Sequence, residues 1–103
     1  MFACVTGFHI KEDEVEAAIK VYRDEVIPMR QAGKGSEGKG SIGGYLLVDR
    51  KTGKGFAITL WDRAEDNIAA DKSLYYEEPK SKFKSHLASS HVDWGLYEVC
   101  TQG

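Results

Sequence analysis

Residues 43–61 predict a β-hairpin: Gly43-Gly44-Tyr45-Leu46-Leu47-Val48-Asp49-Arg50-Lys51-Thr52-Gly53-Lys54-Gly55-Phe56-Ala57-Ile58-Thr59-Leu60-Trp61. Both ends of this segment are rich in aliphatic, aromatic and β-branched residues, which favour strands. The polar residues 49–54 separate them, and Gly53 can take the positive φ that closes a short hairpin.

Both faces of the predicted hairpin are apolar. Alternate residues of a strand point to opposite faces, so Phe56, Ile58 and Leu60 share one face, while Ala57, Thr59 and Trp61 share the other. We assign the more aliphatic face to the helices, which directs Trp61 to the opposite side. Because Trp61 lies just before a predicted helix, it is also a pocket candidate. A chain of 103 residues has few helices, so we expect a second copy to cover the remaining face.

The composition is that of one globular domain over residues 1–103, with 42% apolar and 29% charged residues. The net charge of −2 argues against nucleic acid as a partner, because no basic excess is present to neutralise phosphates. No apolar run approaches the roughly 18 residues of a membrane span, and residues 1–10 lack the layout of a signal peptide. We therefore expect a cytoplasmic protein that binds neither nucleic acid nor membranes.

The two cysteines, Cys4 and Cys100, lie near opposite ends without C-x-x-C spacing. This pattern indicates two buried, reduced thiols rather than a zinc or redox motif. Cys4 has no evident activating partner for a nucleophilic role. We predict no metal, since His86 and His91 lack the i, i+4 spacing of a helical metal site and no third ligand is evident.

Two helical regions flank the hairpin. An apolar stripe from Val15 to Met29 predicts the first helix, with Asp13 as its N-cap and Pro28 ending or kinking it near Ile27. The second region begins after Asp62, and Pro79 is expected to interrupt it. Its three lysines at 80, 82 and 84 are interpreted as a solvated face. Residues 1–10 and 91–100 predict the first and last strands.

A mobile glycine-rich loop is expected at residues 33–44. Its segment Gly33-Lys34-Gly35-Ser36-Glu37-Gly38 matches the G-x-G-x-x-G spacing of dinucleotide sites. Such a site needs a preceding strand and a following helix, whereas here a helix precedes and a strand follows. We therefore predict a connector that binds no nucleotide.

The resulting order is strand, helix, strand, strand, helix, strand. It predicts an α+β, ferredoxin-like βαββαβ fold: an antiparallel four-stranded sheet with both helices on one face and the first and third strands in the middle. The opposite face would be a large apolar patch, which face-to-face pairing of two copies would cover.

The chain resembles the dimeric α/β-barrel superfamily, in the antibiotic-biosynthesis-monooxygenase-like (ABM-like) group. The resemblance rests on the hairpin from Tyr45 to Asp62, on Arg23-Asp24-Glu25-Val26-Ile27-Pro28 and on Tyr97-Glu98-Val99. It implies a homodimer with a pocket between sheet and helices in each protomer. The glycine-rich insertion at 33–41 departs from the group. Haem degradation is not expected, because His9 stands near where haem-degrading relatives have an asparagine.

The resemblance further implies oxidation of a small aromatic or quinone-like substrate by molecular oxygen, with no cofactor. His86 and His91, in a stretch similar to one near the second helix of many members, are the candidate catalytic residues. The substrate-binding candidates are His9, Tyr22, Tyr45, Trp61, Tyr75 and Trp94. Three functions stay open: a cofactor-independent monooxygenase, a non-catalytic module for a small apolar ligand, and a dimerisation module without ligand. A polar group in an apolar pocket would favour the first, a pocket without titratable residues the second, and a filled interior the third.

Overall fold

A computed structural model of the chain describes residues 1–32, 40–71, 74–89 and 93–103, with only the backbone for 74–76. Its elements, in chain order, are β1 (Phe2–His9), α1 (Val15–Val21), the π-helical turn η1 (Tyr22–Val26), α2 (Ile27–Ala32), β2 (Gly43–Val48), β3 (Lys54–Trp61), α3 (Ala64–Asp71), α4 (Leu74–Lys84) and β4 (Asp93–Glu98). Residues 33–39 of the predicted mobile loop lie outside the described residues, whereas Gly43 and Gly44 begin β2.

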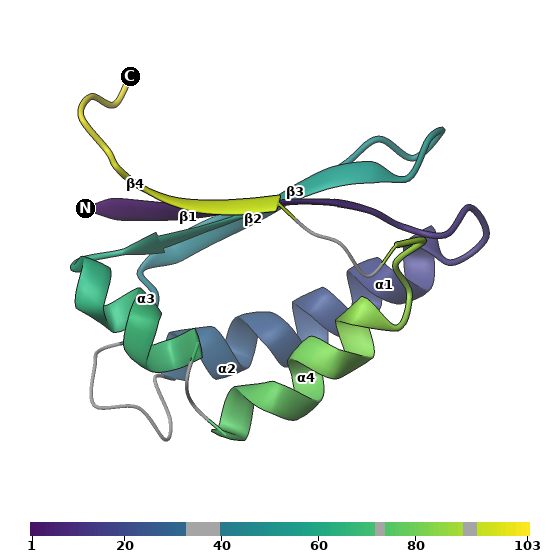
Figure 1. Cartoon of the computed structure of the whole chain (residues 1–103), viewed down its shortest axis with the longest axis horizontal. Helices are drawn as coiled ribbons and strands as arrows, with labels where there is room; N and C mark the ends of the chain where they lie inside the picture. The colour runs from purple at the N-terminus through teal and green to yellow at the C-terminus, as the bar shows by residue number, and fades with distance from the viewer. Residues whose placement is uncertain (33–39, 72–73, 90–92) are drawn as a thin grey trace.

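The four strands form one antiparallel sheet in the order β2-β3-β1-β4. All helices lie on one side of it (Figure 1). The predicted ferredoxin-like α+β fold is therefore confirmed, including the central position of β1 and β3. The described part of the chain contains no helix long and apolar enough to span a membrane.

The β2–β3 hairpin closes as predicted. Gly53 has φ = +81°, and its N–H donates to the Asp49 carbonyl at 2.8 Å. A side chain at Gly53 would be strained at this φ, and its Cβ would lie 2.4 Å from the Ile10 carbonyl oxygen. The turn therefore requires glycine.

The first helix differs from the prediction at its N-cap. The N-cap of α1 is Glu14 rather than Asp13, and no side chain caps it, because the Glu14 carboxylate is hydrogen-bonded to His86. The predicted effect of Pro28 near Ile27 takes the form of a break in the α-helical pattern: α1 ends at Val21, and α2 begins at Ile27. The preceding turn widens into η1, where the Ile27 N–H donates to the Tyr22 carbonyl. Proline lacks an N–H and clashes with the carbonyl four residues earlier, and the wider turn accommodates both constraints.

Pro79 does not interrupt the second helical region as predicted. It lies inside α4, and its ring is buried. Packing of the ring offsets the one backbone hydrogen bond that proline cannot make.

The assignment of the two faces of β3 is wrong. Ala57, Thr59 and Trp61 face the helices and are buried, while Phe56, with Ile58 and Leu60 on its side, faces away. Side-chain volume explains the outcome better than hydrophobicity. Small residues at 55 and 57 leave room under the helices for the β1 residues that pair with them, such as Phe8 opposite Gly55. Trp61 then fills the space beneath α3.

The core has two clusters. In the larger one, Phe83 packs edge-on against Phe8 and Tyr22, with ring centroids 5.2 and 5.3 Å apart. The smaller one contains Cys4, Trp61 and Ala70. Both cysteines are free, but only Cys4 is buried. The prediction of two buried thiols is therefore wrong for Cys100, because β4 ends at Glu98 and the last residues lie outside the sheet.

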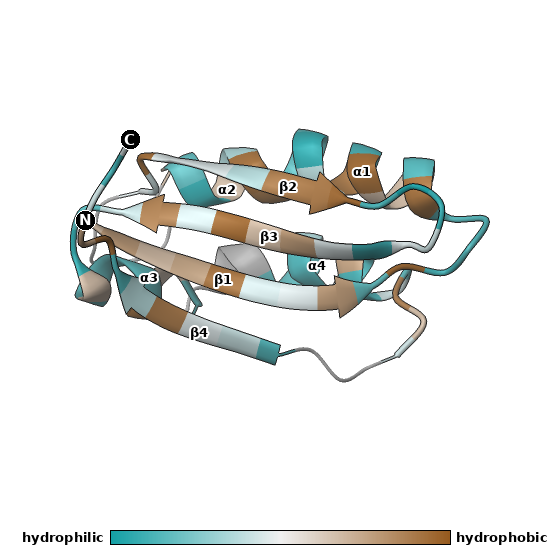
Figure 2. Cartoon of the chain, turned by 90° about the horizontal axis from the view of Figure 1, so that it is seen from above, coloured by the Kyte–Doolittle hydropathy of each residue, from teal (hydrophilic) through white to brown (hydrophobic). Residues whose placement is uncertain are grey.

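The open face of the sheet carries large apolar side chains that solvent reaches. They come from the alternate positions of β2, β3 and β4, where Tyr45, Leu47, Phe56 and Tyr97 are 42–64% exposed. Figure 2 looks onto this face, with the four strands in front and the helices behind. We refer to these four residues as the open-face patch.

Candidate functional site

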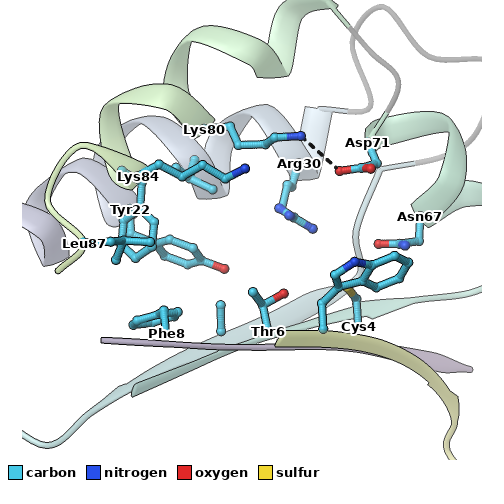
Figure 3. Close-up of a pocket in the computed structure, with 14 residues that line it drawn as sticks. Cys4, Thr6, Phe8, Tyr22, Arg30, Asn67, Asp71, Lys80, Lys84 and Leu87 are labelled. Atoms are coloured by element: carbon cyan, nitrogen blue, oxygen red, sulfur yellow. Dashed lines mark hydrogen bonds and ion pairs between the residues drawn. The ribbon is translucent and has the colours of Figure 1, made fainter. Parts of the chain in front are cut away.

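A cavity of about 430 Å³ lies between the sheet and the helices. The residues that line it come from seven elements and the α4–β4 connection: Cys4, Thr6, Phe8, Tyr22, Val26, Arg30, Ala57, Asn67, Asp71, Lys80, Phe83, Lys84, Leu87 and Trp94. Figure 3 shows most of them around a common space. The walls combine apolar side chains with polar and charged ones, which enter from both sides.

The alternation of side chains along β1 and the spacing of residues along the helices determine which side chains line the cavity. In β1, Cys4, Thr6 and Phe8 share the face toward the helices. On the helix side, the lining side chains form one row. It runs from Tyr22, at the start of the wide η1 turn, to Arg30 in α2. Single π-turns inserted in α-helices frequently occur at functional sites.

The Tyr22 hydroxyl points into the cavity (Figure 3). Tyr22 is only 5% exposed, yet its hydroxyl forms no hydrogen bond with any residue that the structure describes. Asn67, on α3, is 6% exposed, and its side chain also forms no hydrogen bond with any described residue. The Trp61 indole N–H is the only fully buried polar side-chain group without a partner among the described residues, so the Tyr22 and Asn67 polar groups are accessible and positioned to bond to a ligand in the cavity.

Three cations border the cavity. Arg30 donates to the Thr59 hydroxyl at 3.3 Å, and its guanidinium carbon lies 6.0 Å from the centre of the Trp61 ring. Lys80 pairs with Asp71 at 3.4 Å. Lys84 forms no ion pair with any described residue.

Cys4 is the one lining residue with a nucleophilic sulfur. Burial raises the pKa of its thiol, an effect that the nearby Arg30 charge opposes. A thiol with a raised pKa stays protonated near neutral pH and is a poor nucleophile. We assign Cys4 to the wall of the cavity.

The structure brings two of the predicted substrate-binding residues, Tyr22 and Trp94, to the cavity. Trp61 is 0% exposed and lies behind the lining, packed against Cys4, and no described residue accepts a hydrogen bond from its indole N–H. Tyr45 and His9 lie elsewhere: Tyr45 belongs to the open-face patch, and His9 is exposed and hydrogen-bonded to the Thr52 carbonyl.

Two more predicted residues cannot be placed in the cavity. His91 and the side chain of Tyr75 lie outside the described part of the chain.

His86 does not line the cavity. It lies just after α4, where its Nδ1 is 2.8 Å from a Glu14 carboxylate oxygen, and its backbone carbonyl accepts from Lys11. These hydrogen bonds connect the segment just after α4 with the segment just before α1.

We expect this pair to make stability depend on pH in the acid range. The hydrogen bond from His86 lowers the pKa of Glu14 below its ordinary value of 4.5. A carboxylate whose pKa is lowered by folding stabilises the protein above its unfolded pKa, and this stabilisation is lost as pH falls through the folded value. The stability difference between the parent and Glu14→Gln, measured by urea unfolding, should therefore be present above pH 4.5 and shrink below it. Glu12→Gln, on an exposed neighbour, is the control and should show no such change.

The comparisons with solved structures concern the fold. An antibiotic biosynthesis monooxygenase matches with a TM-score of 0.74 and 15% identity over 98% of this chain and 100% of the other. A proposed antibiotic biosynthesis monooxygenase from Nitrosomonas europaea matches with a TM-score of 0.73, 13% identity and the same coverage. SnoaB, a cofactor-independent oxygenase from Streptomyces nogalater, matches in a mutant form with a TM-score of 0.72 and 13% identity, over 98% and 94% of the two chains.

The chain has the ABM-like fold. No known family profile and no curated protein matches its sequence.

Six polar residues of this cavity were absent from the predicted site: Thr6, Arg30, Asn67, Asp71, Lys80 and Lys84. Of the three lysines interpreted as a solvated face, Lys82 and Lys84 are exposed and Lys80 is half-buried, but Lys80 and Lys84 also border the cavity. Residues four apart share a helix face, and Leu87 follows on the same side, so the spacing contained the signal. Nothing in the local sequence distinguishes Asn67 as a cavity residue.

Proposed function

We propose that this protein is a cofactor-independent oxygenase of a small aromatic or quinone-like substrate bound in the cavity. The observation that carries the proposal is the Tyr22 hydroxyl, which faces a cavity of about 430 Å³ with both apolar and polar walls and lacks a described protein partner. This volume falls within the usual range of small-molecule sites, about 300–1,000 Å³. The ABM-like fold, shared with an oxygenase described as cofactor-independent, adds support.

The chemistry needs an electron-rich substrate and a site that stabilises its anion. An anthrone, for example, loses a proton to give an oxygen-centred anion that reduces molecular oxygen. One oxygen atom enters the ring as the new carbonyl of a quinone, and the other leaves as water. Tyr22 and Asn67 would donate hydrogen bonds to the substrate oxygens where negative charge develops. The apolar walls would exclude water and strengthen those bonds.

A cavity with polar groups argues against a module that only dimerises, since that function predicts a filled interior. A non-catalytic binding module differs from the enzyme only in turnover. The two are separated by measuring binding and oxygen consumption together.

The test uses dithranol, a dihydroxyanthrone, as substrate. We expect the protein to accelerate oxygen uptake and the appearance of the dihydroxyanthraquinone above the rate in buffer. Tyr22→Phe should lower the rate by about 100-fold, because it removes one donor to the developing anion. Tyr45→Phe makes the same chemical change outside the cavity and is expected to retain the parent rate.

Two results would contradict the oxygenase. Saturable binding of dithranol without faster oxygen uptake would indicate a binding module. Equal rates for the Tyr22→Phe variant and the parent would remove Tyr22 from the mechanism.

We also infer that two copies of the chain pair through the open-face patch. The support is the patch itself: four large apolar side chains, on β2, β3 and β4, on a face that no described helix covers. Large contiguous apolar patches of this kind usually mark an interface. Two identical sheets facing each other across a two-fold axis would cover both patches at once.

A further inference from the structure

The charged side chains that line the cavity differ in balance from those of the whole chain. The net charge of the chain is −2, yet the described lining contains Arg30, Lys80 and Lys84 against a single carboxylate, Asp71. Lys80 and Asp71 neutralise each other at 3.4 Å. The described lining therefore contains more basic than acidic side chains, although the chain as a whole is slightly acidic.

The neighbouring Lys82 provides an internal comparison. It pairs with Glu25 at 2.7 Å and Glu78 at 3.7 Å, and it does not line the cavity. Lys84, two residues further along the same helix, borders the cavity without an ion pair to any described residue. The described acidic side chains near α4 therefore pair with Lys82, which points away from the cavity, and leave Lys84 without an ion pair.

Arg30 approaches the same space from α2. Its contacts with the Thr59 hydroxyl and the Trp61 ring hold the guanidinium on the cavity side. Figure 3 shows the ends of Arg30, Lys84 and Tyr22 directed toward one central region. A planar guanidinium beside an ammonium and a hydroxyl is a donor set that matches a carboxylate.

We propose that the ligand of this cavity is an aromatic acid whose carboxylate binds Arg30 and Lys84, with its ring system against the apolar wall. The wall includes Phe8, Phe83 and Trp94. This inference rests on the proposed function for the aromatic character of the ligand and adds the acidic group. At about 430 Å³ the cavity suits two or three fused rings with one acidic group.

The test compares two probes of nearly equal shape by isothermal titration calorimetry at pH 7 and low salt: 2-naphthoate and the neutral 2-naphthalenemethanol. We expect 2-naphthoate to bind about tenfold more tightly, because charge-assisted hydrogen bonds to the carboxylate replace neutral ones. Lys84→Gln should remove most of this difference and leave the affinity for the alcohol unchanged. Lys82→Gln is the matched control and should alter neither affinity. Raising the salt concentration should weaken only the binding of 2-naphthoate.

Each result has a distinct meaning. Equal affinities, tighter binding of the alcohol, or binding of neither probe would overturn the aromatic-acid proposal. A Lys84→Gln variant that still binds 2-naphthoate tenfold more tightly than the alcohol would also overturn it. Preference for 2-naphthoate in a protein that does not oxidise dithranol would support this inference and contradict the oxygenase. Oxidation of dithranol without a preference for 2-naphthoate would support the oxygenase and contradict the aromatic-acid proposal.

Discussion

Replacement of Trp61 by alanine is expected to lower the free energy of unfolding by about 3–5 kcal/mol. Trp61 is 0% exposed and packs against Cys4, Ala70 and the partly buried Leu96, so truncation would leave a large void between β3 and α3. Domains of this size are stable by only about 5–15 kcal/mol, so the loss is a large share of the total. The measurement is urea unfolding followed by circular dichroism, with the midpoint and slope fitted separately.

Two variants control this prediction. Trp61→Phe keeps most of the apolar volume and removes an indole N–H that has no hydrogen-bond acceptor among the described residues, so it should cost much less than Trp61→Ala. Trp94→Ala removes a tryptophan that is 65% exposed and should change stability by about 0.5 kcal/mol or less. Unchanged stability of Trp61→Ala would contradict the burial of the ring.

The double substitution of Leu47→Glu and Phe56→Glu is expected to convert a dimer into single chains. The two residues are cross-strand partners on β2 and β3 and are both exposed in the open-face patch. In a face-to-face dimer the double variant would bring four carboxylates into an apolar interface, where unpaired charges are strongly unfavourable. Sedimentation velocity at micromolar concentration should show twice the chain mass for the parent and 11.4 kDa for the variant.

Ile68→Glu is the matched control for dimerisation. Ile68 is an exposed apolar residue of similar size, 47% exposed, but it lies on α3 on the other side of the sheet. The variant should remain dimeric. A parent protein that already sediments at the mass of one chain would refute the dimer, and equal dissociation of the Ile68→Glu variant would refute the interface.

Much of the fold was predictable because the patterns that specify it are local. Alternation of side chains and the turn chemistry around Gly53 are sufficient to predict the β2–β3 hairpin. The βαββαβ order then leaves few antiparallel topologies, and right-handed connections select the observed order of strands.

The candidate site was less predictable. Tyr22 and Trp94 were accessible to sequence reasoning as aromatic residues in an apolar context, and both line the cavity. His86 was selected by resemblance of a short segment, and the structure pairs it with Glu14 instead. A sequence of one chain contains no signal for a contact between residues 72 positions apart.

Local periodicity thus specified the elements of this protein and their order, whereas tertiary packing decided which faces they present. Both sides of β3 are apolar, so hydrophobicity could not orient it; the fit of Gly55 and Ala57 beneath the helices, with Trp61 under α3, decided the question. The same holds for the lysines of α4. The sequence gives their charge. Whether a lysine faces a carboxylate or a cavity depends on which residues the fold places opposite it, because electrostatic interactions act through space rather than along the chain.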